Sequence, residues 1–426
     1  IGNMSPLERQ ERLVKMHSTQ ENIYSDPMAK LSSRYTVGVS SKAIQGCAVP
    51  VLQKAIQLVA TSADIFGIVI HEDHGIPGQK FNKTSVVPNV VELTFQSNQQ
   101  FDQWAQEVCN QPMGNHSVTD GIFAIIQAGS STFLFTCVHP LFLDGHGSFL
   151  FHEWVHRTYA LGEAPEGINA LLEQVPSFRE CIKEQENYMH SERCAQDRVY
   201  WDGFSRACAV TRLPRYYTSY ESRPQGTVHS EVSLELVQQI NAFSGGSNIR
   251  FAAFFKALTA IYFQKTIFDL EGDVVLQTVL HGRSRDNRAI GNTSKPLFMR
   301  CPVRGSFEST MEATMSSMEE CFGHGQFPVS QVTCLNAAFA SPDIVVNVLP
   351  SSIGHNQVTI CPKLFTSQHE EYGFHLTVYG WTAATISLCL SYSQDCFLEN
   401  EAGAALESIL FMATQVLENQ LLPIDD

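Results

Sequence analysis

Hydrophobic and polar positions along the chain follow two periods, one typical of strands and one typical of helices. Short apolar runs rich in β-branched and aromatic residues predict strands at 34–39, 65–70, 90–95, 122–128, 133–138, 273–280, 343–349, 374–379 and 384–392. The segment 228–236 reads as a strand that leads into a helix. Apolar residues that recur every three or four positions predict helices at 5–22, 51–60, 101–109, 177–204, 250–268 and 401–419. Strands and helices follow one another in mixed order, which predicts an α/β (α+β) fold.

One stretch, 131–156, combines a strand pattern, a break and a helix pattern in the sequence STFLFTCVHPLFLDGHGSFLFHEWVH. The apolar run 133–138 predicts a core strand that ends at His139. The chain then turns at Asp144, and the pattern predicts a helix from Ser148, a residue type that suits an N-cap. A histidine at the end of a core strand, with an aspartate five residues on, indicates a loop that presents side chains to a cleft.

The length and composition are typical of a large globular protein. A chain of 426 residues is too long for one ordinary hydrophobic core and predicts two domains or two similar lobes. Hydrophobic residues make up 44% of the chain and charged residues 17%, as expected for a well-packed protein. No run of about 18 apolar residues is free of polar breaks, so we expect no membrane span. The polar start of the chain indicates no secretory signal.

The net charge indicates which kinds of partner the protein binds, and the cysteines indicate its cellular compartment. The net charge of −15 argues against a nucleic-acid partner, because phosphate binding requires a dense basic patch. It excludes no small-molecule substrate. Twelve cysteines are scattered without a CxxC pair, so we expect reduced, mostly buried thiols and a cytoplasmic protein.

The motif in the central stretch resembles the signature of the superfamily that contains condensation domains, chloramphenicol acetyltransferase and the plant-type BAHD acyltransferases. That signature is two histidines, three variable residues and Asp-Gly. His139 matches the first histidine, and Asp144 and Gly145 match the last two positions. The second histidine is the family's catalytic one, and Pro140 occupies its place here.

Weaker similarities extend over nearly the whole chain. The helical segment 177–204 carries Tyr-Trp near its end, like the family's crossover between lobes, and Arg283 resembles an arginine that closes a strand of the second lobe. The resemblance implies two lobes of the chloramphenicol-acetyltransferase type, each a mixed sheet with flanking helices, and an active-site tunnel between them. The expected divisions are an N-terminal lobe, a helical crossover and a C-terminal lobe, at 1–176, 177–211 and 212–426.

The resemblance also assigns roles to the motif residues. In the family, the second histidine takes a proton from the acceptor hydroxyl or amine as that group attacks a thioester, and such help is worth ~10²–10⁴ in rate. Proline has no titratable group, so Pro140 cannot supply it and can only shape the floor of the tunnel. His139 and His146 are the stand-ins for the base. Asp144 corresponds to a mainly structural anion that an arginine holds, here Arg283.

The expected site residues therefore fall into three groups. The catalytic candidates are His139, Asp144 and His146, and Arg283 is the structural partner of the aspartate. The expected substrate-binding residues are Pro140, Gly145 and His375. The last of these lies on the predicted closing hairpin, where some family members place tunnel residues, although a strand histidine bonded to its neighbours is the simpler interpretation.

A rival motif lies in the same stretch. His152 and His156 frame an HExxH sequence, which on a helix places two imidazoles one turn apart for zinc with a glutamate base. A zinc peptidase also requires a third ligand, and Glu163, Glu166 and Glu173 are candidates only by position. The resemblance already explains this helix as the one that packs behind the Asp-Gly turn, so we expect neither a metal nor a bound cofactor.

The resemblance implies a stand-alone condensation- or acyltransferase-like enzyme of specialised (secondary) metabolism. It would join an acyl group, carried by CoA or a carrier-protein thioester, to a small-molecule amine or alcohol without the usual base. Two alternatives stay open. One is a tunnel enzyme that cyclises or rearranges a polyketide- or peptide-like intermediate without acyl transfer. The other is a non-catalytic binding or partner protein built from a degraded acyltransferase.

Overall fold

The computed structural model describes most of the chain, namely residues 13–26, 36–43, 47–74, 76–82, 86–114, 117–162, 164–216, 225–266, 273–283, 287–340, 343–350, 353–355, 358–360, 362–367, 372–381 and 385–418. The chain forms two compact units, and each contains several stretches of sequence. The first unit comprises Ile1–Met189, Arg283–Ser294 and Ile353–Ser367, and the second comprises His190–Gly282, Lys295–Ser352 and Gln368–Asp426.

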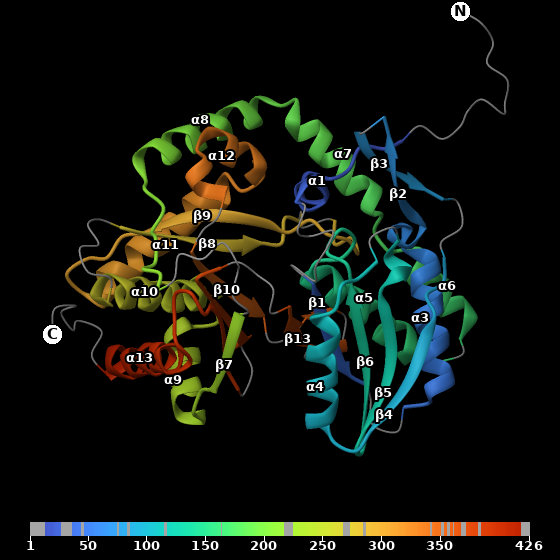
Figure 1. The fold of residues 1–426 in the computed structure, drawn as a ribbon. Helices are drawn as coiled ribbons and strands as arrows, with labels where there is room; N and C mark the ends of the chain where they lie inside the picture. The colour runs from blue at the N-terminus through green and yellow to red at the C-terminus, as the bar shows by residue number, and fades with distance from the viewer. Residues whose placement is uncertain are drawn as a thin grey trace, which may run out of the picture. The chain divides into compact units, whose positions relative to one another are not determined.

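The main sheet of the first unit has five strands in the order β13-β1-β6-β5-β4 (Figure 1). Their bounds are Val37–Lys42 (β1), Val90–Phe95 (β4), Ile122–Ala128 (β5), Ser131–Val138 (β6) and Pro362–Thr366 (β13). The pair β4 and β5 is parallel, and the other neighbours are antiparallel. The central strands read as continuous apolar runs because helices cover both faces of this sheet.

Side chains along β5 alternate between these two faces. Phe123 and Ile125 belong to the core that α3 (Val49–Ser62) and α5 (Gly145–Ala160) share. Ala124 and Ile126 belong to a second core, under α4 (Asn98–Cys109). Figure 1 accordingly shows α4 on one side of the sheet and α3 with α5 on the other.

The remaining elements of the first unit surround this layer. A two-stranded hairpin joins β2 and β3, and a second short antiparallel pair joins β11 and β12. The bounds of these elements are Ser18–Ser25 (α1), Asp64–Gly67 (η1), Ile68–Asp73 (β2), Ile76–Phe81 (β3), Val118–Asp120 (η2), Pro165–Leu172 (α6), Phe178–Met189 (α7), Ile353–His355 (β11) and Val358–Ile360 (β12).

The second unit is built on a six-stranded mixed sheet in the order β7-β15-β14-β10-β8-β9. Its strands are Gln225–Glu231 (β7), Val274–Leu280 (β8), Lys295–Cys301 (β9), Ile344–Pro350 (β10), Phe374–Trp381 (β14) and Ser387–Ser393 (β15). Its helices are Glu192–Ala207 (α8), Leu234–Ser244 (α9), Asn248–Thr266 (α10), Phe307–Gly323 (α11), Val329–Leu335 (α12), Ala337–Ala340 (η3) and Glu399–Glu418 (α13). Helix α10 is apolar nearly all round, so it is buried, with Phe251, Phe254 and Phe255 inaccessible to solvent.

Most of the predicted elements are present. The strands predicted at 90–95 and 122–128 have the predicted bounds, and the predicted closing hairpin is the antiparallel pair β14 and β15. The fold-class prediction, α/β with mixed sheets and flanking helices, is confirmed. Among the described residues, the elements without a sequence prediction are α6, α11 and α12, the strands β3, β9, β11, β12 and β13, and the short 3-10 helices η2 and η3.

Four local predictions were wrong in part. The opening helix begins at Ser18, because residues 13–17 are not helical, and residues 1–12 lie outside the described residues. The segment 65–70 begins with a 3-10 turn, and β2 starts only at Ile68. The helix 177–204 is interrupted after Met189 and restarts as α8 with Ser191 as N-cap. Helix α5 starts at Gly145 with Asp144 as N-cap, so Ser148 lies inside the helix.

The predicted lobe boundaries differ from the compact units. The two units meet in sequence at Met189 and His190, and the segments 283–294 and 353–367 join the first unit although they lie late in the chain.

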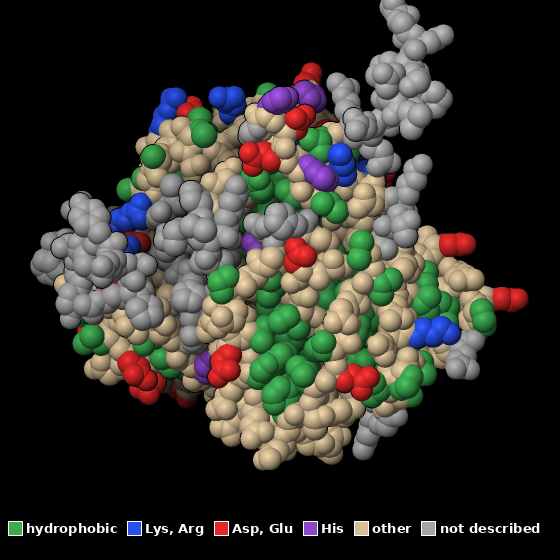
Figure 2. Space-filling model, turned by 45° about the vertical axis from the view of Figure 1, so that its right-hand side comes forward, with side chains coloured by type: hydrophobic (Ala, Val, Ile, Leu, Met, Phe, Trp, Pro, Cys, Tyr) green, Lys and Arg blue, Asp and Glu red, His purple; other side chains and the backbone are tan. Residues whose placement is uncertain are grey.

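Within the described ranges, each helix is either too short or too polar to cross a bilayer. On the face drawn in Figure 2, Lys and Arg side chains are scattered among acidic and hydrophobic ones.

Candidate functional site

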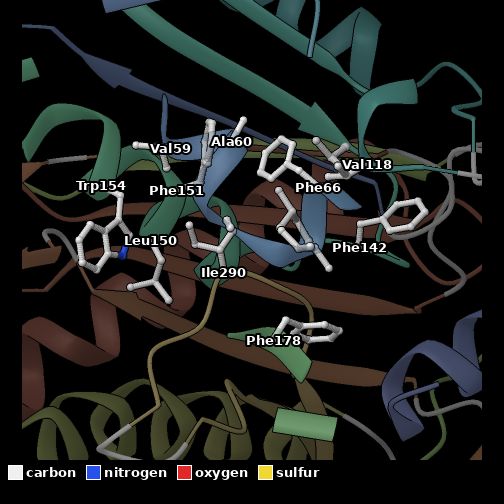
Figure 3. Packing of buried hydrophobic residues seen from close by; sticks show 14 of the residues in the cluster. Val59, Ala60, Phe66, Val118, Phe142, Leu150, Phe151, Trp154, Phe178 and Ile290 are labelled. Carbon is white, nitrogen blue, oxygen red and sulfur yellow. The ribbon is translucent and has the colours of Figure 1, made fainter. Parts of the chain in front are cut away.

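The motif loop follows β6 and is anchored in the core of the first unit. Leu141, Phe142 and Leu143 are at most 2% exposed and belong to the same hydrophobic cluster as α5. In Figure 3, Phe142 lies in this cluster with Phe66 of η1 and Val118 of η2. Three consecutive buried apolar side chains therefore fix the loop, and Asp144 follows directly at the start of α5.

Asp144 is the most heavily hydrogen-bonded side chain of the loop. Its Oδ1 accepts from the backbone N–H of Gly147, which makes Asp144 the N-cap of α5. Arg283 donates to both carboxylate oxygens, at 3.0 and 3.1 Å. Oδ2 also accepts from the backbone N–H groups of Thr293 and Ser294 and from the Ser294 hydroxyl, at 3.0, 2.9 and 2.7 Å. The predicted Asp144–Arg283 ion pair is thus present and bidentate.

These contacts keep the carboxylate ionised. Burial alone would raise the pKa of Asp144, but the charge and hydrogen bonds of Arg283, followed by the hydrogen bond of Ser294, outweigh it and lower the pKa from 3.8 to about 2. The positive charge of a protonated His146 acts in the same direction. With such a low pKa and six donors around it, Asp144 is suited to hold the loop and not to exchange protons at neutral pH.

Arg283 also fixes the segment that precedes β9. Its Nε donates to the Ala289 carbonyl at 3.0 Å and its guanidinium donates to the Gly291 carbonyl at 2.6 Å. Ile290, between these two residues, is buried in the first-unit core, where Figure 3 places it among the labelled side chains. Arg283 therefore connects Asp144, 139 positions earlier in the sequence, to the segment that leads into β9.

Two carboxamides hold the peptide that follows His139. Asn292 Nδ2 donates to the carbonyl of Pro140. Gln20 Nε2, from α1, donates to the carbonyl of Leu141 at 2.9 Å, and the side-chain amides of Gln20 and Gln79 donate to each other at 3.2 Å. The sequence reasoning missed both carboxamides. Neither residue lies in a motif or a periodic pattern that pointed to this loop.

The structure brings together five of the predicted site residues in the first unit: His139, Pro140, Asp144, Gly145 and His146, with Arg283 as their partner. His139 is 2% exposed, and its Nδ1 accepts a hydrogen bond from the Leu141 backbone N–H at 3.1 Å. In the neutral ring the proton then resides on Nε2. Pro140 is buried, and His146 is half-buried in the first turn of α5.

The remaining predicted site residue, His375, lies on β14 in the second unit. Its ring packs edge-on against Tyr372 at 5.3 Å between centroids, and its Nε2 lies 3.4 Å from the Thr377 hydroxyl. These contacts match the simpler interpretation of a strand histidine bonded to its neighbours, while its substrate-binding role remains a prediction.

The histidines of the HExxH sequence are both buried and bonded to hydroxyl groups. The Ser41 hydroxyl on β1 lies 2.7 Å from His152 Nδ1 and 2.8 Å from His156 Nε2, and Thr136 lies 2.9 Å from the other nitrogen of His152. Glu153 turns elsewhere and pairs with Arg288 and Arg157. Among the residues that the structure describes, no three His, Cys, Asp or Glu side chains gather as metal ligands.

Close packing around Asp144 leaves no room for a side chain at position 147. A Cβ built on Gly147 would overlap the Gly291 carbonyl oxygen and lie 3.0 Å from the Arg283 guanidinium. We expect Gly147→Ala to lower the free energy of unfolding by at least about 1–3 kcal/mol, because backbone must move to relieve the clash. The matched control is Gly403→Ala inside α13, where a Cβ meets nothing within 4 Å and should stabilise by about 0.5–1 kcal/mol. Urea unfolding of the two variants checks this, and equal effects would contradict the packing.

Comparison with known proteins identifies the family and the fold. The sequence matches the family model of the condensation domain over residues 10–426. A mutant starter condensation domain of rhizomide synthetase, solved in complex with C8-CoA and Leu-SNAC, has a TM-score of 0.80 at 17% identity, with 100% of this chain and 99% of that chain covered. The first condensation domain of the CDA synthetase has a TM-score of 0.78 at 15% identity, with 98% and 99% covered.

A third similar structure is the first condensation domain of the calcium-dependent antibiotic synthetase in complex with substrate analogue 3a. Its TM-score is 0.80 at 15% identity, with 98% of this chain and 99% of that chain covered. At these identities the likeness shows the fold, and it confirms the predicted two-lobe architecture. No curated protein matches the sequence. Because the family model spans nearly the whole sequence, this chain belongs to the condensation-domain family.

Proposed function

We propose that this protein is an acyl-transferring condensation enzyme in which the acceptor attacks an acyl thioester without a general base at position 140. The observation that carries the proposal is a loop in which the structural half of the motif is complete and the catalytic half is changed. Asp144 keeps its full set of donors, including the bidentate Arg283. Pro140 has neither a titratable group nor an N–H.

The family supports a thioester donor and a small-molecule acceptor. Condensation domains join acyl groups to acceptors, and the similar rhizomide synthetase domain was solved with C8-CoA and Leu-SNAC. We therefore propose an acyl donor on CoA or on a carrier protein, and an amine acceptor, both reaching a tunnel between the two lobes. An enzyme of secondary metabolism fits these structures, which come from the calcium-dependent antibiotic synthetase and from rhizomide synthetase.

Positioning would then replace proton transfer. An amine that is already neutral needs no base to attack, and correct orientation of donor and acceptor can supply several kcal/mol of the barrier, up to about 7–11 kcal/mol in well-oriented reactions. In this proposal, Asp144 and Arg283 are positioning residues that fix the loop. His139 Nδ1 already accepts from Leu141, so its Nε2 is a proton donor in the neutral ring and not the accepting nitrogen that a base requires.

The same observation also favours a second candidate function. A site that lost only its base could bind a polyketide- or peptide-like intermediate and guide its cyclisation or rearrangement with no thioester involved. In the third class, a binding or partner protein, neither reaction would occur. The change at Pro140 is compatible with all three, so the test has to separate thioester-dependent from thioester-independent turnover.

The experiment compares wild type with Pro140→His and Pro140→Ala, using C8-CoA and Leu-SNAC as first probes. Release of the CoA thiol and the mass of the product are followed together. We expect slow amine-dependent thiol release by wild type and a gain of up to ~10²–10⁴ in Pro140→His, since the restored imidazole can act as base. Pro140→Ala, which removes the ring without adding a base, should give no gain. Turnover of another substrate by wild type without any thioester would instead establish the second function.

A further inference from the structure

We propose that Cys109 and Cys137 form an oxidisable pair that hydrogen peroxide converts into a disulfide beside the motif loop. The inference is independent of the acyl-transfer proposal. Both thiols are fully buried and belong to the cluster under α4. Their sulfur atoms lie 3.6 Å apart, in van der Waals contact, and the residues are 28 positions apart in sequence.

The backbone at this place lets the two sulfurs meet. Cys109 is the last residue of α4, and Cys137 lies on β6, where its Cα pairs with that of Gly38 on β1. A Cβ built on Gly38 would lie only 2.6 Å from the Cys109 sulfur. The thiol of Cys109 therefore occupies the space over Gly38 that any other residue would fill, and this space adjoins Cys137.

The chemistry requires a two-electron oxidant and no other group. Hydrogen peroxide first oxidises one thiolate to a sulfenic acid, with release of the first water or hydroxide. The second sulfur then attacks this sulfenic acid, the S–S bond forms, and the oxygen leaves as a second water after protonation. In total, two S–H bonds are broken, the two sulfurs lose two electrons, and one peroxide becomes two waters.

Burial makes this reaction slow and its product durable. The hydrogen bond with Cys109, followed by burial, raises the pKa of the Cys137 thiol well above its ordinary value, so little thiolate is present at neutral pH. Oxidation therefore depends on opening of the last turn of α4. Once formed, the disulfide is shielded from reductants in the same way. It would tie the end of α4 to a strand that ends one residue before His139.

Peptide mapping of the native protein tests the proposal. Folded protein is treated with hydrogen peroxide, the excess is removed with catalase, and free thiols are alkylated before and after denaturation. Digestion and mass spectrometry should find the Cys109 and Cys137 peptides joined and two hydrogens lighter, and the oxidised protein should melt at a higher temperature. The matched control is Cys334→Ser, an exposed thiol whose loss should leave the cross-link unchanged.

Cys109→Ser and Cys137→Ser should each abolish the cross-link and the rise in melting temperature. Melting curves recorded before oxidation check that each variant folds. The proposal is overturned if Cys334 is oxidised while Cys109 and Cys137 are recovered as free thiols that react only after denaturation. It is equally overturned if either cysteine is found joined to a different partner, or if Cys109→Ser gains the same thermal stabilisation from peroxide.

Discussion

Replacing Asp144 with alanine will lower the free energy of unfolding by about 3–5 kcal/mol, the range measured when one partner of a buried ion pair is removed. The variant leaves the Arg283 guanidinium, whose side chain is 1% exposed, without its carboxylate. It also deprives Gly147, Thr293 and Ser294 of the acceptor for their backbone N–H groups. Urea unfolding of wild type and variant at neutral pH measures the difference.

A matched control is available on the surface. Glu180 and Lys183 form an ion pair at 2.6 Å in which both side chains are more than half exposed. We expect Glu180→Ala to cost no more than about 1 kcal/mol, because water and side-chain entropy offset an exposed pair. If Asp144→Ala and Glu180→Ala cost the same, Asp144 does not hold the loop.

The second large effect is a loss of stability in mild acid that originates in His152 and His156, the two buried histidines that contact the Ser41 hydroxyl. Burial lowers the pKa of His156 from 6.5 to about 4, and burial followed by the charge of His156 lowers the pKa of His152 well below 6.5. The folded protein therefore keeps both rings neutral, while the unfolded chain protonates them below about pH 6.5. Protons bind the unfolded state more strongly, so stability falls as the pH decreases from 6.5 towards 4.

The size of this effect follows from the His156 shift. Stability should decrease by up to about 1.4 kcal/mol per pH unit and histidine, which gives about 3 kcal/mol for His156 over this window. The carboxylate of Asp144 acts at lower pH. Its pKa is depressed from 3.8 to about 2, so its contribution is present above 3.8 and is lost between 3.8 and 2. The two windows are separate.

Urea unfolding at pH 7, 6, 5 and 4 distinguishes the histidine effect from other titrations. His156→Gln keeps a polar group near Ser41 but cannot take up a proton, so its stability should fall by about 3 kcal/mol less than that of wild type between pH 7 and 4. His74→Gln serves as the control, because that side chain is 95% exposed. If His156→Gln declines as steeply as wild type, or if the control reproduces its effect, then His156 takes up a proton in the folded protein as readily as in the unfolded chain, which would contradict a buried neutral ring.

The central motif was predictable because its signals are local. The strand before His139, the turn at Asp144 and the helix after it follow from the apolar pattern of one stretch, and the resemblance supplied Arg283. The helix start was misjudged because Ser148 and Asp144 are both capping residue types. The choice of Asp144 is fixed by groups far away in the chain, since its carboxylate also bonds Arg283, Thr293 and Ser294.

What the sequence did not reveal is the distant contacts. The HExxH sequence resembles a metal motif, but the imidazole of His152 contacts the hydroxyl of Ser41. Ser41 lies 111 positions away, so the local sequence carries no sign of this contact. Gln20 bonds Leu141 across 121 positions, and β13 completes the first sheet although it lies late in the chain. Such pairings carry no periodic signal, because each partner is a single polar residue or a short strand in an irregular segment.

If acyl transfer needs no base from the protein, the pH dependence of the wild-type rate will follow the acceptor and not a histidine of the loop. Initial rates of transfer from C8-CoA are measured for two amine acceptors whose own pKa values differ, in wild type, His139→Gln and His146→Gln. We expect an inflection that moves with the pKa of the acceptor and is the same in all three proteins. An inflection that stays fixed when the acceptor is changed, and that disappears in one of the two variants, would identify a protein base and contradict base-free transfer.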